Sequence, residues 1–454
     1  MRSILAALIL LVQFPVSAAN LPRDFRFGVS TAAHQVEGNN SNSDWWQWEE
    51  IPGKIKNGQR SGIATDSWGH QDEDISNMKS LGVSVYRYSI EWAKVEPKEG
   101  VFDEKVLAQY SDQVDRLLRA GIEPMITLQH FTLPLWVKDH GGWDWDGIAG
   151  AFETYLTKVI PVFGKRVKYW ITINEPMSMI AGGYMSDVFP PGVNNLSSIG
   201  TPMINMLRAH GRAYHRIHEI LEKQNFTPMV GLAHNLIVLD PLHSYNLLEH
   251  YVTRRFSQIY NWAIPDALTT GEFKIFFPFM INAKADIPEA KNTQDFFGLN
   301  YYTRYRVKVN LFSKDKFEKV VTPGAPVNDL GWEIYPEGIA RLLNQIQERF
   351  PQMPIWITEN GIADADDHLR TKYIKEHLDQ IADRIEAGVP VKGYCQWTLN
   401  DNFEWAEGFT AHFGFYSLDP KTLNRVPRQS AADFSEITRS VKMGLPIPRS
   451  REDQ

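Results

Sequence analysis

Eight short apolar runs, rich in β-branched and aromatic residues, recur along the chain and are separated by longer segments with helical periodicity. Strands that alternate with helices form a parallel sheet, and eight such units favour a sheet that closes on itself. We therefore predict an α/β fold: a single (β/α)8 TIM barrel with elaborated βα loops at its C-terminal face. The runs are FRFGVSTA (25–32), VSVYRYSI (83–90), EPMITLQH (123–130), YWITINEP (169–176), MVGLAHNL (229–236), DFFGLNYY (295–302), PIWITENG (354–361) and VKGYCQWTL (391–399).

The segments between the runs have the pattern of amphipathic helices. One of them spans residues 103–121 and ends at a glycine, and its predicted buried face holds Val106, Tyr110, Val114, Leu117 and Leu118. An open, doubly wound sheet is the alternative architecture. No G-x-G-x-x-G sequence or P-loop follows any of the eight runs, so the closed barrel is favoured.

The first 19 residues have the layout of a secretory signal peptide. Arg2 precedes an apolar run from Ile4 to Val12, and small residues follow at 17–19. The apolar run is too short to cross a membrane as a helix. We predict a signal peptide at 1–19, a barrel domain at 20–445 and a loose tail at 446–454. The mature protein is expected to be secreted, to the periplasm or the exterior, without a membrane anchor.

Charge and cysteine content restrict the possible partners. The formal net charge is −7, which disfavours binding to nucleic acid because a polyanion requires a concentrated basic surface. The single cysteine, Cys395, precludes an internal disulfide and a cysteine-rich metal site, and its apolar surroundings predict a buried thiol. We expect no cofactor and no metal. The sequence leaves the oligomeric state open.

Nearly every predicted strand ends in a side chain that can titrate or form hydrogen bonds. Catalytic groups of such barrels gather where the strands end, because the loops after the strands form one face. Glutamine, histidine, arginine and two glutamates at one mouth are typical of a pocket for a polyhydroxylated substrate. The residues are His34, Gln35 and Glu37, Arg87, His130, Asn174 and Glu175, Asn235, Asn300 and Tyr302, Glu359 and Asn360, and Gln396 and Trp397.

The two glutamates suggest acetal cleavage by a pair of carboxyl groups. That reaction needs one protonated carboxylic acid and one ionised carboxylate. We assign Glu359 as the ionised group, because Arg87 could pair with it and Tyr302 could donate to it. Glu175 has no cationic neighbour in the sequence and is assigned as the acid.

The motifs that carry these residues resemble the signatures of family 1 glycoside hydrolases, the β-glucosidases and their relatives. TINEP (172–176) resembles the acid/base motif and ITENG (357–361) the nucleophile motif. The resemblance extends from about residue 24 to 440. It includes, in the family's order, FRFGVSTAAHQVEG, VYRYSIEW, TLQHFTLPLW, GLNYYT, GWEIYPEG and QWTLNDNFEWAEGF.

The resemblance implies a retaining mechanism on a glycoside or oligosaccharide, with Glu359 as nucleophile and Glu175 as acid and then base. It implies that residues matching Arg87, Asn300 and Tyr302 surround the nucleophile and that Trp332 lines the aglycone side. It implies a binding site for the non-reducing sugar made of Gln35, His130, Asn174, Trp397, Glu404 and Trp405.

Two departures from the family pattern and one retained residue bear on the substrate. His130 is followed by Phe131, where many members have tryptophan, so an indole hydrogen bond near the 3-hydroxyl of the sugar is lost, and Thr132 and Leu133 follow in place of the usual acidic or amide residue. Glu404 is retained, whereas members that act on 6-phosphorylated glycosides usually lack a carboxylate there. A non-phosphorylated substrate is therefore expected. The identities of the glycone and the aglycone remain open.

Other functions have weaker support in the sequence. His215 and His218 have a spacing that can chelate a metal, but no H-E-x-x-H motif accompanies them, and no G-x-S-x-G elbow indicates a serine hydrolase. A non-catalytic sugar-binding protein on the same barrel is a second alternative, although such relatives usually lose one carboxylate. Transglycosylation at the same site is a third.

Overall fold

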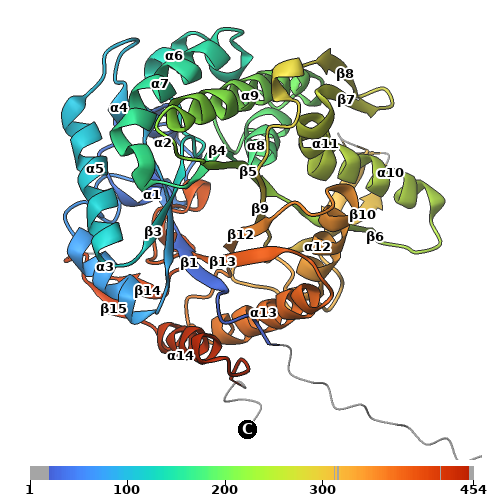
Figure 1. Cartoon of the computed structure of the whole chain (residues 1–454). Coiled ribbons are helices and arrows are strands. Elements are labelled where there is room, and N and C mark those ends of the chain that lie inside the picture. The colour runs from blue at the N-terminus through green and yellow to red at the C-terminus, as the bar shows by residue number, and fades with distance from the viewer. Residues whose placement is uncertain (1–19, 311, 314–315, 420, 449–454) are drawn as a thin grey trace, which may run out of the picture.

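The computed structural model describes residues 20–310, 312–313, 316–419 and 421–448 (Figure 1). The predicted signal peptide and residues 449–454 of the predicted tail lie outside this part of the chain. Within the described part of that tail, Ile447 is buried.

Eight parallel strands close into a barrel, in the spatial order β1-β13-β12-β9-β5-β4-β3-β2 (Figure 1). All eight coincide with the predicted apolar runs, so the TIM barrel prediction is confirmed. The strands are β1 (Arg26–Ser30), β2 (Val85–Ser89), β3 (Glu123–Thr127), β4 (Tyr169–Asn174), β5 (Met229–Asn235), β9 (Phe296–Asn300), β12 (Ile355–Asn360) and β13 (Val391–Trp397).

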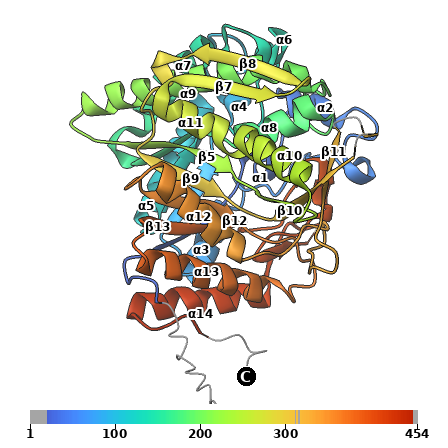
Figure 2. The same cartoon turned by 90° about the vertical axis from the view of Figure 1, so that its right-hand side faces the viewer.

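Long helices surround the barrel, and short ones lie in the loops (Figures 1 and 2). The longer helices are α3 (Gln71–Ser80), α5 (Glu104–Arg119), α7 (Ile148–Phe163), α9 (Gly200–Glu222), α10 (Leu247–Ser257), α11 (Ala263–Thr270), α12 (Glu337–Arg349), α13 (Arg370–Glu386) and α14 (Gln429–Met443). The short ones are α1 (Ala33–Val36), α2 (Asp44–Glu49), α4 (Trp92–Val95), α6 (Leu135–Asp139) and α8 (Pro176–Met179).

The α5 helix shows how local sequence sets these elements. The Asp103 side chain accepts from the backbone N–H groups of Lys105 and Val106, which caps the helix N-terminus. The buried face was predicted only in part: Leu107 is buried, whereas Leu118 is 39% exposed. Adjacent helix positions point about 100° apart. Because Leu117 faces the core, the adjacent Leu118 points toward solvent.

Strands outside the barrel elaborate its loops. The hairpin of β7 (Glu272–Phe277) and β8 (Ile281–Asp286) packs beside α9 and α11 (Figure 2). The strands β6 (Val238–Pro241), β10 (Arg304–Val309) and β11 (Phe317–Val320) form a three-stranded sheet, here called the rim sheet. A small hairpin joins β14 (Tyr416–Leu418) to β15 (Arg425–Pro427). These strands lie outside the eight predicted apolar runs.

The barrel interior has an apolar layer below a polar one. The apolar layer consists of Val85, Met125, Ile171, Ala233, Phe296, Trp356 and Cys395. Cys395 is fully buried, as predicted, and burial raises the pKa of its thiol to about 12. Because side chains alternate along a strand, residues two positions further face the same interior. These polar-layer positions are Arg87, Thr127, Asn235, Thr358 and Trp397.

Register shifts occur on both strands that lead to the predicted catalytic glutamates. The pairing of β4 with β5 shifts between Ile171 and Asn174, and that of β12 with β9 shifts between Ile357 and Glu359. Such irregularities bend a strand locally and redirect its side chains. Ile171 and Trp356 face the barrel interior, so with strictly alternating side chains Asn174 and Glu359, three residues later, would point away from it. The shifts allow both to face the barrel mouth.

Candidate active site

A pocket of about 250 Å³ opens where the barrel strands end. Most of the predicted site residues contribute directly to its wall, whereas Gln35, Arg87 and Asn300 lie behind the wall and contact those that do. The predicted residues in the wall are His130, Asn174, Glu175, Tyr302, Trp332, Glu359, Trp397, Glu404 and Trp405.

Glu359, near the end of β12, is 3% exposed, and its carboxylate accepts hydrogen bonds from two side chains. Arg87 Nη1 contacts Oε1 in an ion pair, and the Tyr302 hydroxyl donates to Oε2 at 2.6 Å. Both contacts were predicted from the sequence. A cation and a hydroxyl donor together stabilise the ionised carboxylate.

Glu175 directly follows β4 and adopts left-handed backbone angles, with φ 44° and ψ 61°. Its Oε1 accepts from Asn300 Nδ2 at 2.6 Å and from Asn235 Nδ2 at 3.2 Å, and its Oε2 accepts from the Ser178 hydroxyl at 2.7 Å. All three donors are neutral. Burial, followed by the nearby charge of Glu359, raises the pKa of Glu175 to about 7. The two carboxyl groups therefore share one pocket but have opposite environments.

Arg87 and Asn300 connect the two carboxyl groups through Asn174. Arg87 Nη2 donates to Asn174 Oδ1 at 2.6 Å, and Asn300 Nδ2 donates to the same oxygen at 3.2 Å. Asn300 pairs in register with Glu359 on the neighbouring strand, while its amide donates to Glu175. Asn300, which the resemblance placed around the nucleophile, thus contacts the acid as well.

His130 is a neutral imidazole in the pocket wall. Burial, followed by the charge of Arg87, holds its pKa well below the ordinary value. Asn174 Nδ2 lies 3.0 Å from His130 Nε2, and since the amide nitrogen is a donor, Nε2 accepts and Nδ1 carries the proton. Nδ1 is buried without a hydrogen-bond partner among the described residues.

Two tryptophans and a glutamate form another part of the wall. The Trp397 and Trp405 rings each stack on His130, with ring centroids 5.9 Å apart in both pairs. Glu404 Oε2 accepts from Gln35 Nε2 at 3.1 Å and from Trp397 Nε1 at 3.4 Å. Burial raises the pKa of Glu404 to about 8. This combination of flat apolar faces and paired polar groups suits a sugar ring.

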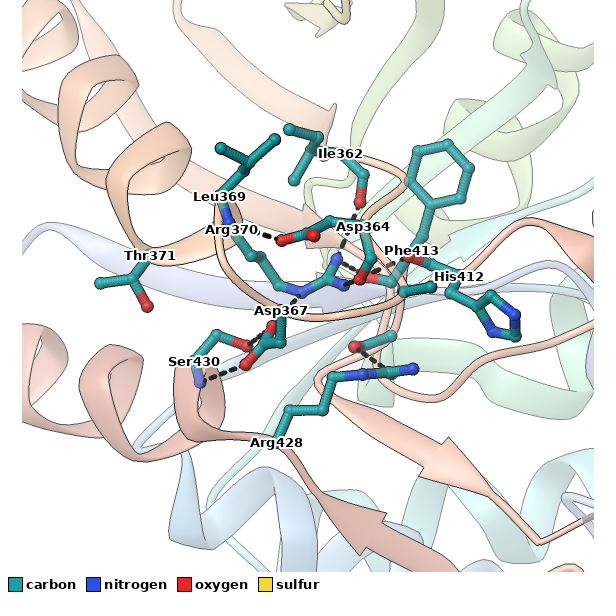
Figure 3. Close-up of polar contacts among 12 residues, drawn as sticks. Ile362, Asp364, Asp367, Leu369, Arg370, Thr371, His412, Phe413, Arg428 and Ser430 are labelled. Atoms are coloured by element: carbon teal, nitrogen blue, oxygen red, sulfur yellow. Dashed lines mark hydrogen bonds and ion pairs between the residues drawn. The ribbon is translucent and has the colours of Figure 1, made fainter. Parts of the chain in front are cut away.

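Trp332 and Phe413 also line the pocket, with ring centroids 6.2 Å apart. Both rings also lie against Tyr302, the hydroxyl donor to Glu359. Phe413 is held by Arg370, the buried first residue of α13 (Figure 3). Arg370 donates to the backbone carbonyls of Ile362, Asp364, His412 and Phe413, and its Nε donates to Asp367. One guanidinium thus joins the loop after the Glu359 strand to the loop that carries Phe413.

Several pocket residues were not selected from the sequence. Ser178 contacts Glu175 because the one-turn helix α8 places it three residues later, a spacing that the sequence contains. Asn235 was noted as a strand end but was not assigned to the site. Phe131, next to His130, lines the pocket as the motif placed it. Other residues come from segments outside the barrel strands, and their positions follow only from tertiary packing: Phe189, Tyr260, Tyr305, Lys319 and Phe413.

The two histidines whose spacing could chelate a metal, His215 and His218, have protein partners. His215 Nε2 contacts the Glu289 carbonyl, and His218 contacts Glu222 and Asp295 through its two ring nitrogens. Among the residues that the structure describes, no group of three or more histidine, cysteine, aspartate or glutamate side chains is arranged to hold a metal ion. Over the same residues, no helix has the length and apolar character needed to span a membrane.

Comparisons with known proteins give one consistent result. Residues 17–443 match the family model described as glycosyl hydrolase family 1. The chain is 33% identical over 452 residues to β-glucosidase A of Thermotoga maritima, a match that covers 94% of this chain and 99% of that protein.

Two solved structures extend this similarity to three dimensions. The β-glycosidase from Pyrococcus horikoshii has a TM-score of 0.84 and 34% identity, over 94% of this chain and 96% of that one. The β-glucosidase from Thermotoga maritima in complex with glucoimidazole has a TM-score of 0.86 and 32% identity, over 93% of this chain and 99% of that one.

Proposed function

This chain belongs to glycosyl hydrolase family 1 and is a β-glycosidase, and on that premise we propose that it is a retaining, exo-acting enzyme. It removes the terminal non-reducing β-D-glucosyl residue, or a related β-glycosyl residue, from non-phosphorylated glycosides or oligosaccharides. The observation that carries the proposal is the contrast between Glu359, paired with Arg87, and Glu175, which has only neutral donors.

In the first step, Glu359 attacks the anomeric carbon as the bond to the leaving oxygen breaks. Glu175 is protonated below its pKa of about 7 and gives its proton to that oxygen. A covalent glycosyl ester on Glu359 and a free aglycone result. Because the ester carries no charge, the electrostatic contribution of Glu359 to the raised pKa of Glu175 disappears at this stage.

In the second step, the now ionised Glu175 takes a proton from water, and the water oxygen attacks the anomeric carbon. The ester bond breaks, the sugar leaves with its original configuration, and Glu359 recovers its negative charge. The proton that Glu175 gains restores the starting state. The fall in the pKa of Glu175 after ester formation is what lets one carboxyl group serve both steps.

The shape and chemistry of the pocket support the substrate class. A pocket of about 250 Å³ suits one terminal sugar better than a groove that runs along a polymer. Around Glu404 the hydrogen-bond donors are the neutral Gln35 and Trp397, so a phosphate at this end would meet no cation from them. The T. maritima relative in complex with glucoimidazole supports a glucosyl unit as the first substrate to test.

The test is turnover of an aryl β-D-glucoside by the unaltered enzyme and by Glu359→Ala. Loss of the nucleophile is expected to lower kcat by about 10⁴-fold or more. Azide should restore activity to the variant and yield the α-glycosyl azide, since it attacks from the face that Glu359 occupied. Glu289→Ala serves as the control, because this carboxyl is remote from the pocket wall.

Other outcomes would change the proposal. Binding of sugars without turnover of any β-glycoside would indicate a non-catalytic binding protein. Transfer products that dominate at high acceptor concentration would indicate a transglycosidase. We also propose that residues 1–19 direct secretion. Intact-mass measurement of the exported protein is expected to give an N-terminus close to Asn20, and retention of the full chain in the cell would contradict this.

A further inference from the structure

One lysine stands out at the active-site pocket. Among the residues that the structure describes, Lys319 is the only lysine or arginine that lines this pocket, and it comes from β11 of the rim sheet. Tyr305, from β10 of the same sheet, lines the pocket next to it. The catalytic glutamates follow barrel strands, whereas these two residues belong to a sheet outside the barrel. Lys319 therefore lies where the aglycone, rather than the terminal sugar, would be held.

Lys319 forms no ion pair with any acidic side chain of the described residues. Its Nζ lies 5.4 Å from the centroid of the Tyr305 ring. The neighbouring Glu318 hydrogen-bonds to Asn310, so it is engaged elsewhere. The Lys319 side chain as a whole is exposed, but the protein atoms around its ammonium desolvate it enough to lower its pKa, and no carboxylate compensates.

The acidic residues of the pocket do not offset this cation. Glu359 is already paired with Arg87. Burial raises the pKa of Glu175 to about 7 and that of Glu404 to about 8, so both are substantially protonated in the free enzyme near neutral pH. The ammonium of Lys319 is thus the charge in the pocket wall that lacks an opposite charge.

We propose that Lys319 selects β-glycosides whose aglycone carries an anionic group, with Tyr305 and Trp332 as aromatic surfaces for the body of the aglycone. This inference rests on the proposed function. An anionic group bound there would supply the opposite charge that Lys319 lacks in the free pocket, and the aromatic rings would pack against a flat or sugar-like group. The contact is remote from the bond that breaks, so its effect is expected in KM more than in kcat.

Paired substrates test the proposal. One pair is 4-carboxyphenyl and 4-carbamoylphenyl β-D-glucoside, which differ in charge but little in shape. A second pair is a β-glucosyl disaccharide with either glucuronic acid or glucose as the reducing unit. A preference for the anionic member of the first pair would indicate an aryl acid as the aglycone, and a preference in the second pair would indicate an acidic sugar. The quantity compared is the ratio of kcat/KM for the anionic over the neutral member of a pair.

In Lys319→Met, this ratio is expected to fall about 5-fold for at least one pair, the scale of one partly exposed ion pair. Lys319→Arg keeps the charge and should retain the ratio, and added salt should lower the ratio only in the unaltered enzyme and in Lys319→Arg. Lys308→Met removes an exposed lysine from the adjacent strand β10 and should leave the ratio unchanged.

An unchanged ratio in Lys319→Met for both pairs would overturn the inference while leaving the proposed function intact, because the neutral glucosides would still be hydrolysed. No turnover by the unaltered enzyme of neutral β-glycosides with any glycone would overturn the proposed function, and the inference with it.

Discussion

The Ser178 hydroxyl is one of three hydrogen-bond donors that lower the pKa of Glu175 against the effect of burial. It donates to Glu175 Oε2 at 2.7 Å, while Asn300 and Asn235 donate to Oε1. A hydrogen bond to the ionised form favours ionisation, so Ser178 lowers a pKa that burial has raised to about 7. Ser178→Ala should therefore raise the pKa of Glu175 further.

The size of the shift follows from the strength of this contact. A hydrogen bond to a charged group contributes about 1.5–3 kcal/mol, and the protonated carboxyl retains part of it. The difference between the two protonation states is then roughly 1.4 kcal/mol, or about one pKa unit. The alkaline limb of the pH profile should move from about 7 to roughly 8 in Ser178→Ala.

The assay is the pH dependence of kcat/KM, which reports ionisations of the free enzyme. Methyl β-D-glucoside suits it because its leaving oxygen needs a proton, whereas a dinitrophenyl glucoside depends less on the acid and should show a weaker limb. Ser186→Ala is the matched control, since this hydroxyl donates to the Ala181 and Gly182 carbonyls of the same segment and touches no carboxyl group. A limb that stays in place or moves to lower pH in Ser178→Ala would refute the reasoning.

Three further predictions concern stability and the pocket walls. Glu175→Gln should abolish turnover and raise Tm more at pH 8 than at pH 5. Burial raises the pKa of Glu175 to about 7 in the folded protein, so ionisation destabilises the fold as pH rises. Above the pKa values of the folded and unfolded states this cost is about 3 kcal/mol, and the glutamine variant does not have it. Arg370→Met should lower the free energy of unfolding in urea by about 3 kcal/mol, because it removes a buried cation that donates to Asp367 and to four backbone carbonyls. It should also raise KM for aryl glucosides as Phe413 shifts, with partial rescue by Arg370→Lys. Phe131→Trp should fold normally, because Phe131 also borders a second cavity of about 740 Å³ that can take the larger ring. It should raise kcat/KM for glucosides about 5-fold if the indole N–H donates to the sugar. A large loss of Tm would show that the cavity does not accept the ring.

Much of the architecture and the chemistry was predictable from local sequence. The eight runs matched the eight barrel strands because their apolar content and spacing from helices are local properties. The glutamates at the ends of two runs were predicted to meet, since parallel strands of a barrel end at one face. The partners of Glu359 were also predicted, because Arg87 and Tyr302 belong to strand-end motifs.

Tertiary structure alone decided how these groups are aimed and what surrounds them. The register shifts near Asn174 and Glu359 depend on neighbouring strands, and so does the bond from Asn300 to Glu175, which joins residues 125 positions apart. The positions of Lys319 and Tyr305 depend on a rim sheet that the sequence analysis missed. The physical reason is that alternation fixes the side to which a strand residue points only while register is regular, whereas hydrogen-bond partners and desolvation depend on chain segments remote in sequence. Sequence thus identified the two carboxyl groups, and folding paired Glu359 with a cation while it gave Glu175 only neutral donors.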